Sequence, residues 1–137
     1  REGWYARHNS SYWLGEPYLG IGPSAHSFNG GSRQWNVANN AKYISRMLVD
    51  GNDPSEKWYE TETLTPVQQY HDRLLTGLRT IWGFDPASSP SPMKEYFLEQ
   101  VRPFLQQGLV EFHHGSYRLT RSGKFLADRI TVGLFFG

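Results

Sequence analysis

The chain has 137 residues, of which 38% are hydrophobic and 20% are charged, and its mean hydropathy is −0.60. This composition indicates one ordinary globular domain, or a small domain with a piece of another, and excludes a disordered polar segment. Fourteen Lys and Arg residues face 13 Asp and Glu residues. No overall positive charge would therefore attract nucleic acid or an anionic membrane, and any site for a polyanion must be local.

Cysteine is absent from the sequence. Its absence excludes disulfides, thiolate zinc sites, cysteine nucleophiles and a cysteine-held iron–sulfur cluster within this chain. No apolar run approaches the roughly 18 residues of a membrane span, and the start shows no secretory signal, so we expect a cytoplasmic protein. The chain opens with Arg and a loop-like segment, which suggests a piece of a longer protein.

Residues 1–37 are rich in Gly, Ser, Asn and aromatic residues and show no helical period. Within them, the stretch "YLGIGPSAHSF" from Tyr18 to Phe28 predicts a short apolar strand that Pro23 ends. Glycine weakens a strand, so Gly20 and Gly22 at alternate positions indicate that another backbone or a ligand comes close.

The stretch 38–50 carries apolar residues at helical spacing and predicts a helix with Gly51 as its C-cap. The polar residues that follow, up to residue 63, predict a linker. We therefore place a domain boundary at about residue 55.

The second half contains clear start and stop signals. Thr65 as N-cap, Pro66 and Gln68 predict a helix that Gly83 ends, and a second helix is expected over residues 92–107, kinked or split by Pro103. "LVEFHHGSYRLT" then predicts a hairpin that turns at His114 and Gly115, and Thr120 caps a last helix. Helix, helix, hairpin, helix is the outline of a winged-helix-like unit.

The segments "RHNSSYW", "PYLGIGPSAHSF", "SRQWN", "LTPVQQYHDRLLTGLRTIWGFD" and "YRLTRSGKFLADRITVGLFF" together span most of the chain. This set resembles the C-terminal part of the radical S-adenosylmethionine family of oxygen-independent coproporphyrinogen III oxidase-like proteins, in particular its heme-chaperone branch with the HNxxYW motif. His71-Asp72 and the Pro/Ser-rich loop before residue 92 depart from the family pattern.

The resemblance implies an α+β architecture, with the end of a radical S-adenosylmethionine (β/α) barrel at residues 1–55 and a winged-helix-like C-terminal domain at residues 56–137. The family's CxxxCxxC motif holds a [4Fe–4S] cluster that binds S-adenosylmethionine. This chain has no cysteine, so the resemblance implies that the cluster belongs to a missing N-terminal barrel and that the chain alone is inactive. We assign it no catalytic residue and no site for a metal ion other than heme iron.

Two groups of site residues follow from the resemblance. A heme site is implied for His8 as axial ligand, supported by Asn9, Tyr12 and Trp13. Backbone and small side chains next to S-adenosylmethionine are implied for Gly20, Ile21, Gly22 and Ala25. Neutral imidazole is a common heme ligand and aromatic faces can cover a porphyrin. The expected partners are the barrel, heme or a porphyrinogen, and a protein that accepts heme.

Less specific interpretations of the same residues stay open. His8 and Asn9 can cap a turn while Tyr12 and Trp13 pack on the barrel rim, and His26, His113 and His114 have structural or solvated roles. Arg33 fits a surface ion pair better than a propionate site. A basic cluster on the winged-helix-like unit would suit nucleic acid, although the balanced charge argues against this, and the unit can also serve as a lid. The cluster consists of Arg118, Arg121, Lys124 and Arg129.

Overall fold

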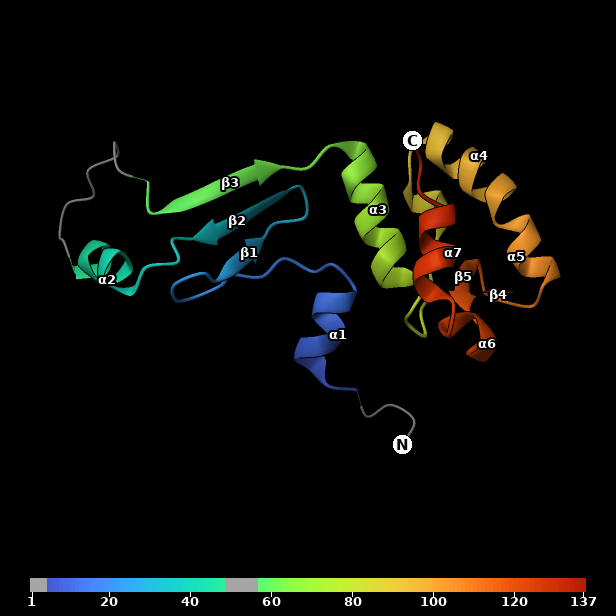
Figure 1. Cartoon of the computed structure of the whole chain (residues 1–137), viewed down its shortest axis with the longest axis horizontal. Helices are drawn as coiled ribbons and strands as arrows, with labels where there is room; N and C mark the ends of the chain where they lie inside the picture. The colour runs from blue at the N-terminus through green and yellow to red at the C-terminus, as the bar shows by residue number, and fades with distance from the viewer. Residues whose placement is uncertain (1–4, 49–56) are drawn as a thin grey trace. The chain divides into compact units, whose positions relative to one another are not determined.

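The computed structural model describes residues 5–48 and 57–137 (Figure 1). The chain divides into two compact units. The larger unit contains Thr65–Gly137 together with the residues that precede Glu16, and the smaller unit is Glu16–Leu64. Both helices and strands are present, so the fold is a mixed helix and sheet structure.

The larger unit is mostly helical and carries one β-hairpin, in which β4 and β5 pair antiparallel (Figure 1). Its elements are α1 (Arg7–Trp13), α3 (Pro66–Gly77), the 3-10 helix η1 (Pro86–Ser88), α4 (Ser91–Gln100), α5 (Arg102–Gln106), β4 (Val110–His113), β5 (Ser116–Leu119), α6 (Arg121–Lys124) and α7 (Ala127–Gly133).

One hydrophobic core joins α3, α4 and α7 to the hairpin. The apolar stripe of α3 supplies Tyr70, Leu74 and Leu78, and all three are completely buried. The remaining buried members of the core are Phe84, Met93, Phe97, Val101, Val110, Leu119, Ile130 and Leu134. Burial of an aliphatic or aromatic side chain contributes about 1.5–3 kcal/mol, so this core is the main stabilising feature of the unit.

Tyr70 also makes a buried polar contact. Its hydroxyl donates a hydrogen bond to the carbonyl oxygen of Leu134 at 2.7 Å, which links α3 to the end of α7. Burial, with a smaller contribution from Tyr96, raises the pKa of Tyr70 well above its ordinary value. The phenol therefore remains a neutral donor at physiological pH.

The start of α3 confirms the predicted capping box. The Thr65 hydroxyl accepts from the backbone N–H of Gln68 at 3.2 Å, and the Gln68 side-chain oxygen accepts from the N–H of Thr65 at 2.7 Å. Pro66 occupies the first helical position, where no donor is needed.

Replacing Thr65 with alanine should lower the free energy of unfolding by about 1 kcal/mol, because it leaves an N-terminal backbone donor of α3 without its side-chain acceptor. Urea unfolding followed by circular dichroism measures the change. Thr65→Ser is the matched control and should retain most of the stability, since serine keeps the hydroxyl. Equal losses in both variants would contradict a capping role.

The other local predictions for this half hold with two changes. The second helix splits at Val101 into α4 and α5, next to Pro103, and the hairpin turns at His114 and Gly115. Thr120 caps α6, and the expected last helix is divided into α6 and α7. However, α3 ends at Gly77 rather than near residue 82.

The early end of α3 has a packing cause. A Cβ atom on Gly77 would lie 3.0 Å from the carbonyl oxygen of Gly83, so the chain folds back closely on the helix. This return lets Phe84 exchange two backbone hydrogen bonds with Tyr117, at 2.7 and 2.8 Å. Continuing the helix would remove Phe84 from this bridge and from the core.

The smaller unit contains a three-stranded sheet of order β1-β2-β3 and the helix α2 (Asn40–Leu48). The strands are β1 (His26–Phe28), β2 (Ser32–Asn36) and β3 (Tyr59–Thr63), and both pairings are antiparallel. Helix α2 confirms the predicted helix, while its predicted C-cap Gly51 lies outside the described residues.

Three expectations for the first half were wrong. Residues 7–13 form a helix where no helical pattern was found, and residues 18–22 form no strand apart from an isolated bridge between Tyr18 and Phe28. The expected linker includes strand β3, which pairs along β2. The strands depend on partners far away in the sequence, and the end of α1 is signalled only by Gly15.

Within residues 5–48 and 57–137, no helix is both long and apolar enough to cross a membrane.

Candidate functional site

Helix α1 carries all four residues that the resemblance assigned to heme. His8 and Tyr12 lie one turn apart, and Asn9 and Trp13 form the neighbouring pair at the same spacing. None of the residues of α1 is buried, and the exposed fractions of Tyr12 and Trp13 are 54% and 41%. The helix therefore presents a histidine and two large aromatic side chains on its surface.

The His8 imidazole is accessible to a ligand. It is exposed, and no hydrogen bond joins it to any other residue in the described part of the chain. The Tyr12 and Trp13 rings meet edge to face with centroids 6.0 Å apart. A neutral imidazole with a free ring nitrogen can coordinate heme iron, and neighbouring aromatic faces can cover a porphyrin plane.

A ring contact precedes α1, and a glycine turn ends it. The Tyr5 ring, just before the helix, packs against Trp82 with centroids 5.8 Å apart. After the helix, Gly15 has a φ of 71° and donates a hydrogen bond to the Tyr12 carbonyl at 3.1 Å. Glycine is favoured here because this left-handed conformation strains other residues.

The four residues assigned to the S-adenosylmethionine cavity lie together in one loop of the smaller unit. The N–H of Gly20 donates to the Ser27 hydroxyl at 3.0 Å, and the N–H of Gly22 donates to the Tyr43 hydroxyl at 3.0 Å. Ile21 between them is 85% exposed. A Cβ atom on Gly20 would overlap the backbone of His26, so glycine is required there by the fold itself.

Asn36 organises this loop and was not identified from the sequence. It is 3% exposed, and its side-chain nitrogen donates to the carbonyls of Gly22 at 2.9 Å and Gly20 at 3.4 Å. Its backbone N–H donates to the carbonyl of Ala25 at 2.9 Å. The Asn36 side-chain oxygen has no partner among the described residues. The one sequence feature that could have indicated this role is the asparagine that ends "SRQWN".

The remaining histidines lie in different surroundings, and His71 makes the most contacts. His71 stacks on Phe135 at a centroid distance of 4.1 Å, and its Nε2 lies 3.1 Å from both the backbone nitrogen and the oxygen of Phe136. It accepts from the N–H or donates to the carbonyl, depending on its tautomer. The exposed pair His113 and His114 lies at the hairpin tip, and His26 faces Trp35 across the sheet.

Charged residues of interest lie mainly on the hairpin and the last helices. Arg118 pairs with Glu111 at 2.6 Å, and Arg79 pairs with Asp128 at 2.5 Å. Arg33 lies directly opposite Glu62 in the antiparallel pairing of β2 and β3. No group of three or more His, Asp and Glu side chains that could hold a metal gathers within residues 5–48 and 57–137.

Comparison with known proteins finds a family match for part of the larger unit. Residues 64–126 match the family model described as the HemN C-terminal domain. This match, together with the HemW relatives below, supports a C-terminal fragment of the HemN/HemW family. The segment from α3 to α6 corresponds to the matched C-terminal domain, with the capped helices and hairpin described above.

Curated relatives in this family are heme chaperones named HemW. The chain is 26% identical to HemW of Bacillus subtilis over 100% of its own length and 36% of the relative. It is 29% identical to HemW of Mycobacterium tuberculosis strain H37Rv, covering 95% of the chain and 31% of the relative. The chain therefore spans about a third of the length of the curated relatives it matches.

A solved HemN structure has the same fold over most of the chain. Its title describes coproporphyrinogen III oxidase (HemN) from Escherichia coli as a radical SAM enzyme. The match has a TM-score of 0.57 at 21% identity and covers 88% of this chain and 28% of the HemN chain. This likeness supports a shared fold.

Proposed function

We propose that the chain supplies the heme-contacting C-terminal portion of a heme chaperone, with His8 as an axial ligand of the heme iron. The observation that carries this proposal is the state of His8 on α1. Its imidazole is exposed and has no hydrogen-bond partner in the described part of the chain, and the half-exposed Tyr12 lies one turn away. The names of the HemW relatives add independent support for heme as the ligand.

Within this proposal the neighbouring residues have distinct roles. Tyr12 and Trp13 cover one face of the porphyrin, since large aromatic rings bury apolar area at a small entropic cost. Asn9, one turn from Trp13, donates from its amide to a polar edge of the ligand or orients the imidazole. We assign no catalytic residue to the chain.

The family's other cofactors are not held by this chain alone. It has no cysteine, so its residues do not fit a thiolate-held [4Fe–4S] cluster, which would belong to the rest of the longer protein. We propose that the loop of Gly20, Ile21, Gly22 and Ala25 lies against S-adenosylmethionine there. In support, Gly22 carries no side chain, and the Asn36 amide donates hydrogen bonds to the carbonyls of Gly20 and Gly22.

We further propose the finer architecture from the family resemblance. Residues 1–55 adjoin the end of a (β/α) barrel, and residues 56–137 form a winged-helix-like domain that covers it as a lid in the cytoplasm. Barrel strands run parallel, whereas β1, β2 and β3 pair antiparallel. Barrel pairing in this region would therefore fall to residues 18–22, with partners supplied by the rest of the longer protein.

The heme chaperone is preferred to the oxidase because the chain contains "HNSSYW" and because its curated relatives are named HemW. An oxidase would instead act on the propionate side chains of a porphyrinogen through a radical generated outside this chain. A chaperone also implies a further partner, a protein that accepts the heme.

A heme titration of the chain tests the proposal. The wild-type chain should bind about one heme with a shifted Soret band, and His8→Ala should weaken binding at least about tenfold because the iron loses its axial ligand. His113→Ala is the matched control, since His113 is also an exposed histidine, and it should bind like the wild type. Equal binding by all three proteins, or saturable binding by none, would overturn the role of His8.

A further inference from the structure

A hollow of about 270 Å³ lies in the larger unit, and none of its lining residues has a role in the function proposed above. It is formed by the turn after α3, the hairpin β4–β5 and helix α6. Its polar lining residues are Thr80, Glu111, Arg118, Thr120, Arg121 and Lys124. The hollow is thus lined by three cationic side chains and one carboxylate.

The charge of this lining is concentrated and partly uncompensated. Three cations and one carboxylate give a formal charge of +2, whereas the whole chain carries only +1. Glu111 neutralises Arg118 through a contact of 2.6 Å. Arg121 and Lys124 have no ion-pair partner among the described residues. Unpaired cations around a concave surface attract a counter-ion more strongly than isolated surface charges do.

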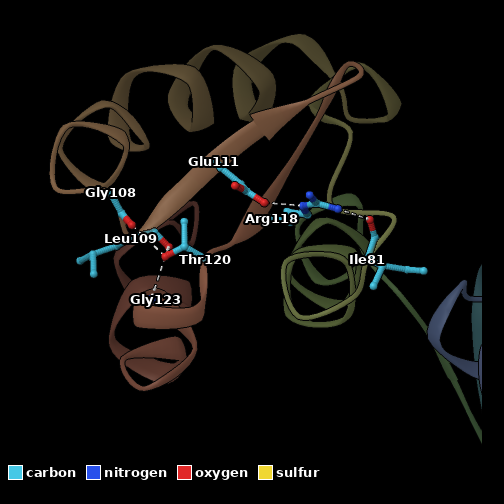
Figure 2. A network of polar contacts seen from close by, with 7 residues as sticks. All are labelled: Ile81, Gly108, Leu109, Glu111, Arg118, Thr120 and Gly123. Atoms are coloured by element: carbon cyan, nitrogen blue, oxygen red, sulfur yellow. Dashed lines mark hydrogen bonds and ion pairs between the residues drawn. The ribbon is translucent and has the colours of Figure 1, made fainter. Parts of the chain in front are cut away.

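Arg118 is held in one orientation. Its Nε donates to the Glu111 carboxylate at 2.6 Å, and its Nη1 donates to the carbonyl oxygen of Ile81 at 3.2 Å (Figure 2). These bonds fix the guanidinium plane between the hairpin and the turn after α3. A guanidinium has five N–H donors, so donors remain for an oxyanion after these two contacts.

The two other cations stand on an anchored helix. The Thr120 hydroxyl donates to the carbonyl of Gly108 at 2.8 Å and accepts from the N–H of Gly123 at 3.1 Å (Figure 2). Arg121 and Lys124 are three residues apart on α6, so their side chains leave the same side of the helix. The backbone that carries both cations is therefore already ordered before a ligand binds.

We propose that this hollow binds the phosphate group of a small phosphorylated molecule. A phosphate dianion matches the formal charge of +2, and Arg and Lys donors suit its oxygens. The volume is sufficient for the phosphate and a sugar-sized remainder but is confined to one place. Nucleic acid would need a longer basic surface, and Asp128, paired with Arg79, and Glu111 both add negative charge close by.

Titration of the 137-residue chain with inorganic phosphate, followed by NMR of the backbone amides, tests the proposal at low ionic strength. Saturable shifts at residues 120–124 are expected, and chloride at matched ionic strength should not reproduce them. The double variant R121Q/K124Q should raise the dissociation constant about tenfold. The control K94Q/R102Q removes the same charge from exposed positions outside the hollow and should bind like the wild type.

A second variant should change the phosphate affinity in the opposite direction. Glu111→Gln keeps an oxygen acceptor for Arg118 but removes the only negative charge of the hollow, so it should tighten phosphate binding severalfold. Unsaturable shifts, or equal weakening in both double variants, would overturn the site. Binding of a short DNA duplex is measured at several salt concentrations. A steep fall in affinity with salt, as expected for several phosphate contacts, would show that the ligand is nucleic acid and would overturn the small-molecule proposal.

Discussion

Replacing Phe97 with alanine should lower the free energy of unfolding of the larger unit by about 3–5 kcal/mol. Phe97 is completely buried on α4, and its ring lies 4.8 Å from that of Phe84 and 5.0 Å from that of Tyr117. The same side chain therefore joins a helix, the return after α3 and the hairpin. Its removal leaves a cavity that three separate elements would have to close, which rigid packing prevents.

Urea unfolding followed by circular dichroism measures this effect. Phe112→Ala is the matched control, because Phe112 also packs against Tyr117 at 4.8 Å but is 59% exposed. The control should lose less than about 1 kcal/mol. If the two variants were equally stable, the core would not be organised around Phe97.

Much of the larger unit could be predicted because its signals are local. Thr65 and Gln68 form a capping box within four residues. Pro103 interrupts its helix whatever the tertiary contacts, because proline lacks a backbone donor. His114 and Gly115 both adopt positive φ, which suits a tight turn between two strands. Such features depend on neighbours in sequence, so the pattern and the structure agree.

The smaller unit could not be predicted in the same way. Strand β3 has the polar sequence "YETET", and it becomes a strand because Thr61 and Glu62 pair with residues of β2 nearly 30 positions earlier. Residues 18–22 have a stronger apolar pattern but only an isolated bridge at Tyr18. Strand formation depends on a partner, and local propensity does not supply one.

The residues of the proposed heme site come from the family resemblance, but their helical conformation was not predicted. "HNSSYW" points to His8 through family resemblance, whereas its helical conformation has no side-chain N-cap and no buried residue to indicate it. Gly15, in the left-handed conformation after Leu14, was the available signal for a helix end. The helix places His8 and Tyr12 on one side, so both side chains can contact the same ligand, which the motif alone does not indicate.

The second large effect is expected for Gly123→Ala, which should destabilise the larger unit by at least about 2 kcal/mol. A Cβ atom on Gly123 would overlap the carbonyl oxygen of Leu109 and lie 2.8 Å from its carbonyl carbon. Both atoms belong to the backbone at the start of the hairpin, so no side chain can move aside. Helix α6 must instead shift away from the hairpin.

That shift should also break specific hydrogen bonds. The N–H of Gly123 donates to the Thr120 hydroxyl at 3.1 Å, and the N–H of Thr120 donates to the Leu109 carbonyl at 3.0 Å. Ser122→Ala is the matched control, since Ser122 is an exposed neighbour on the same helix. Its stability should change by no more than about 0.5 kcal/mol in urea unfolding. Wild-type stability in Gly123→Ala would contradict the close approach of α6 to the hairpin.

Gly123→Ala also separates the proposed phosphate site from simple surface charge. The variant retains Arg121 and Lys124, so binding that depends on charge alone would keep the wild-type affinity. In the hollow described here, displacement of α6 moves both cations away from the fixed Arg118 guanidinium. Phosphate affinity measured on the folded variant should therefore fall severalfold although no charge is lost, because the three cations no longer converge on one anion.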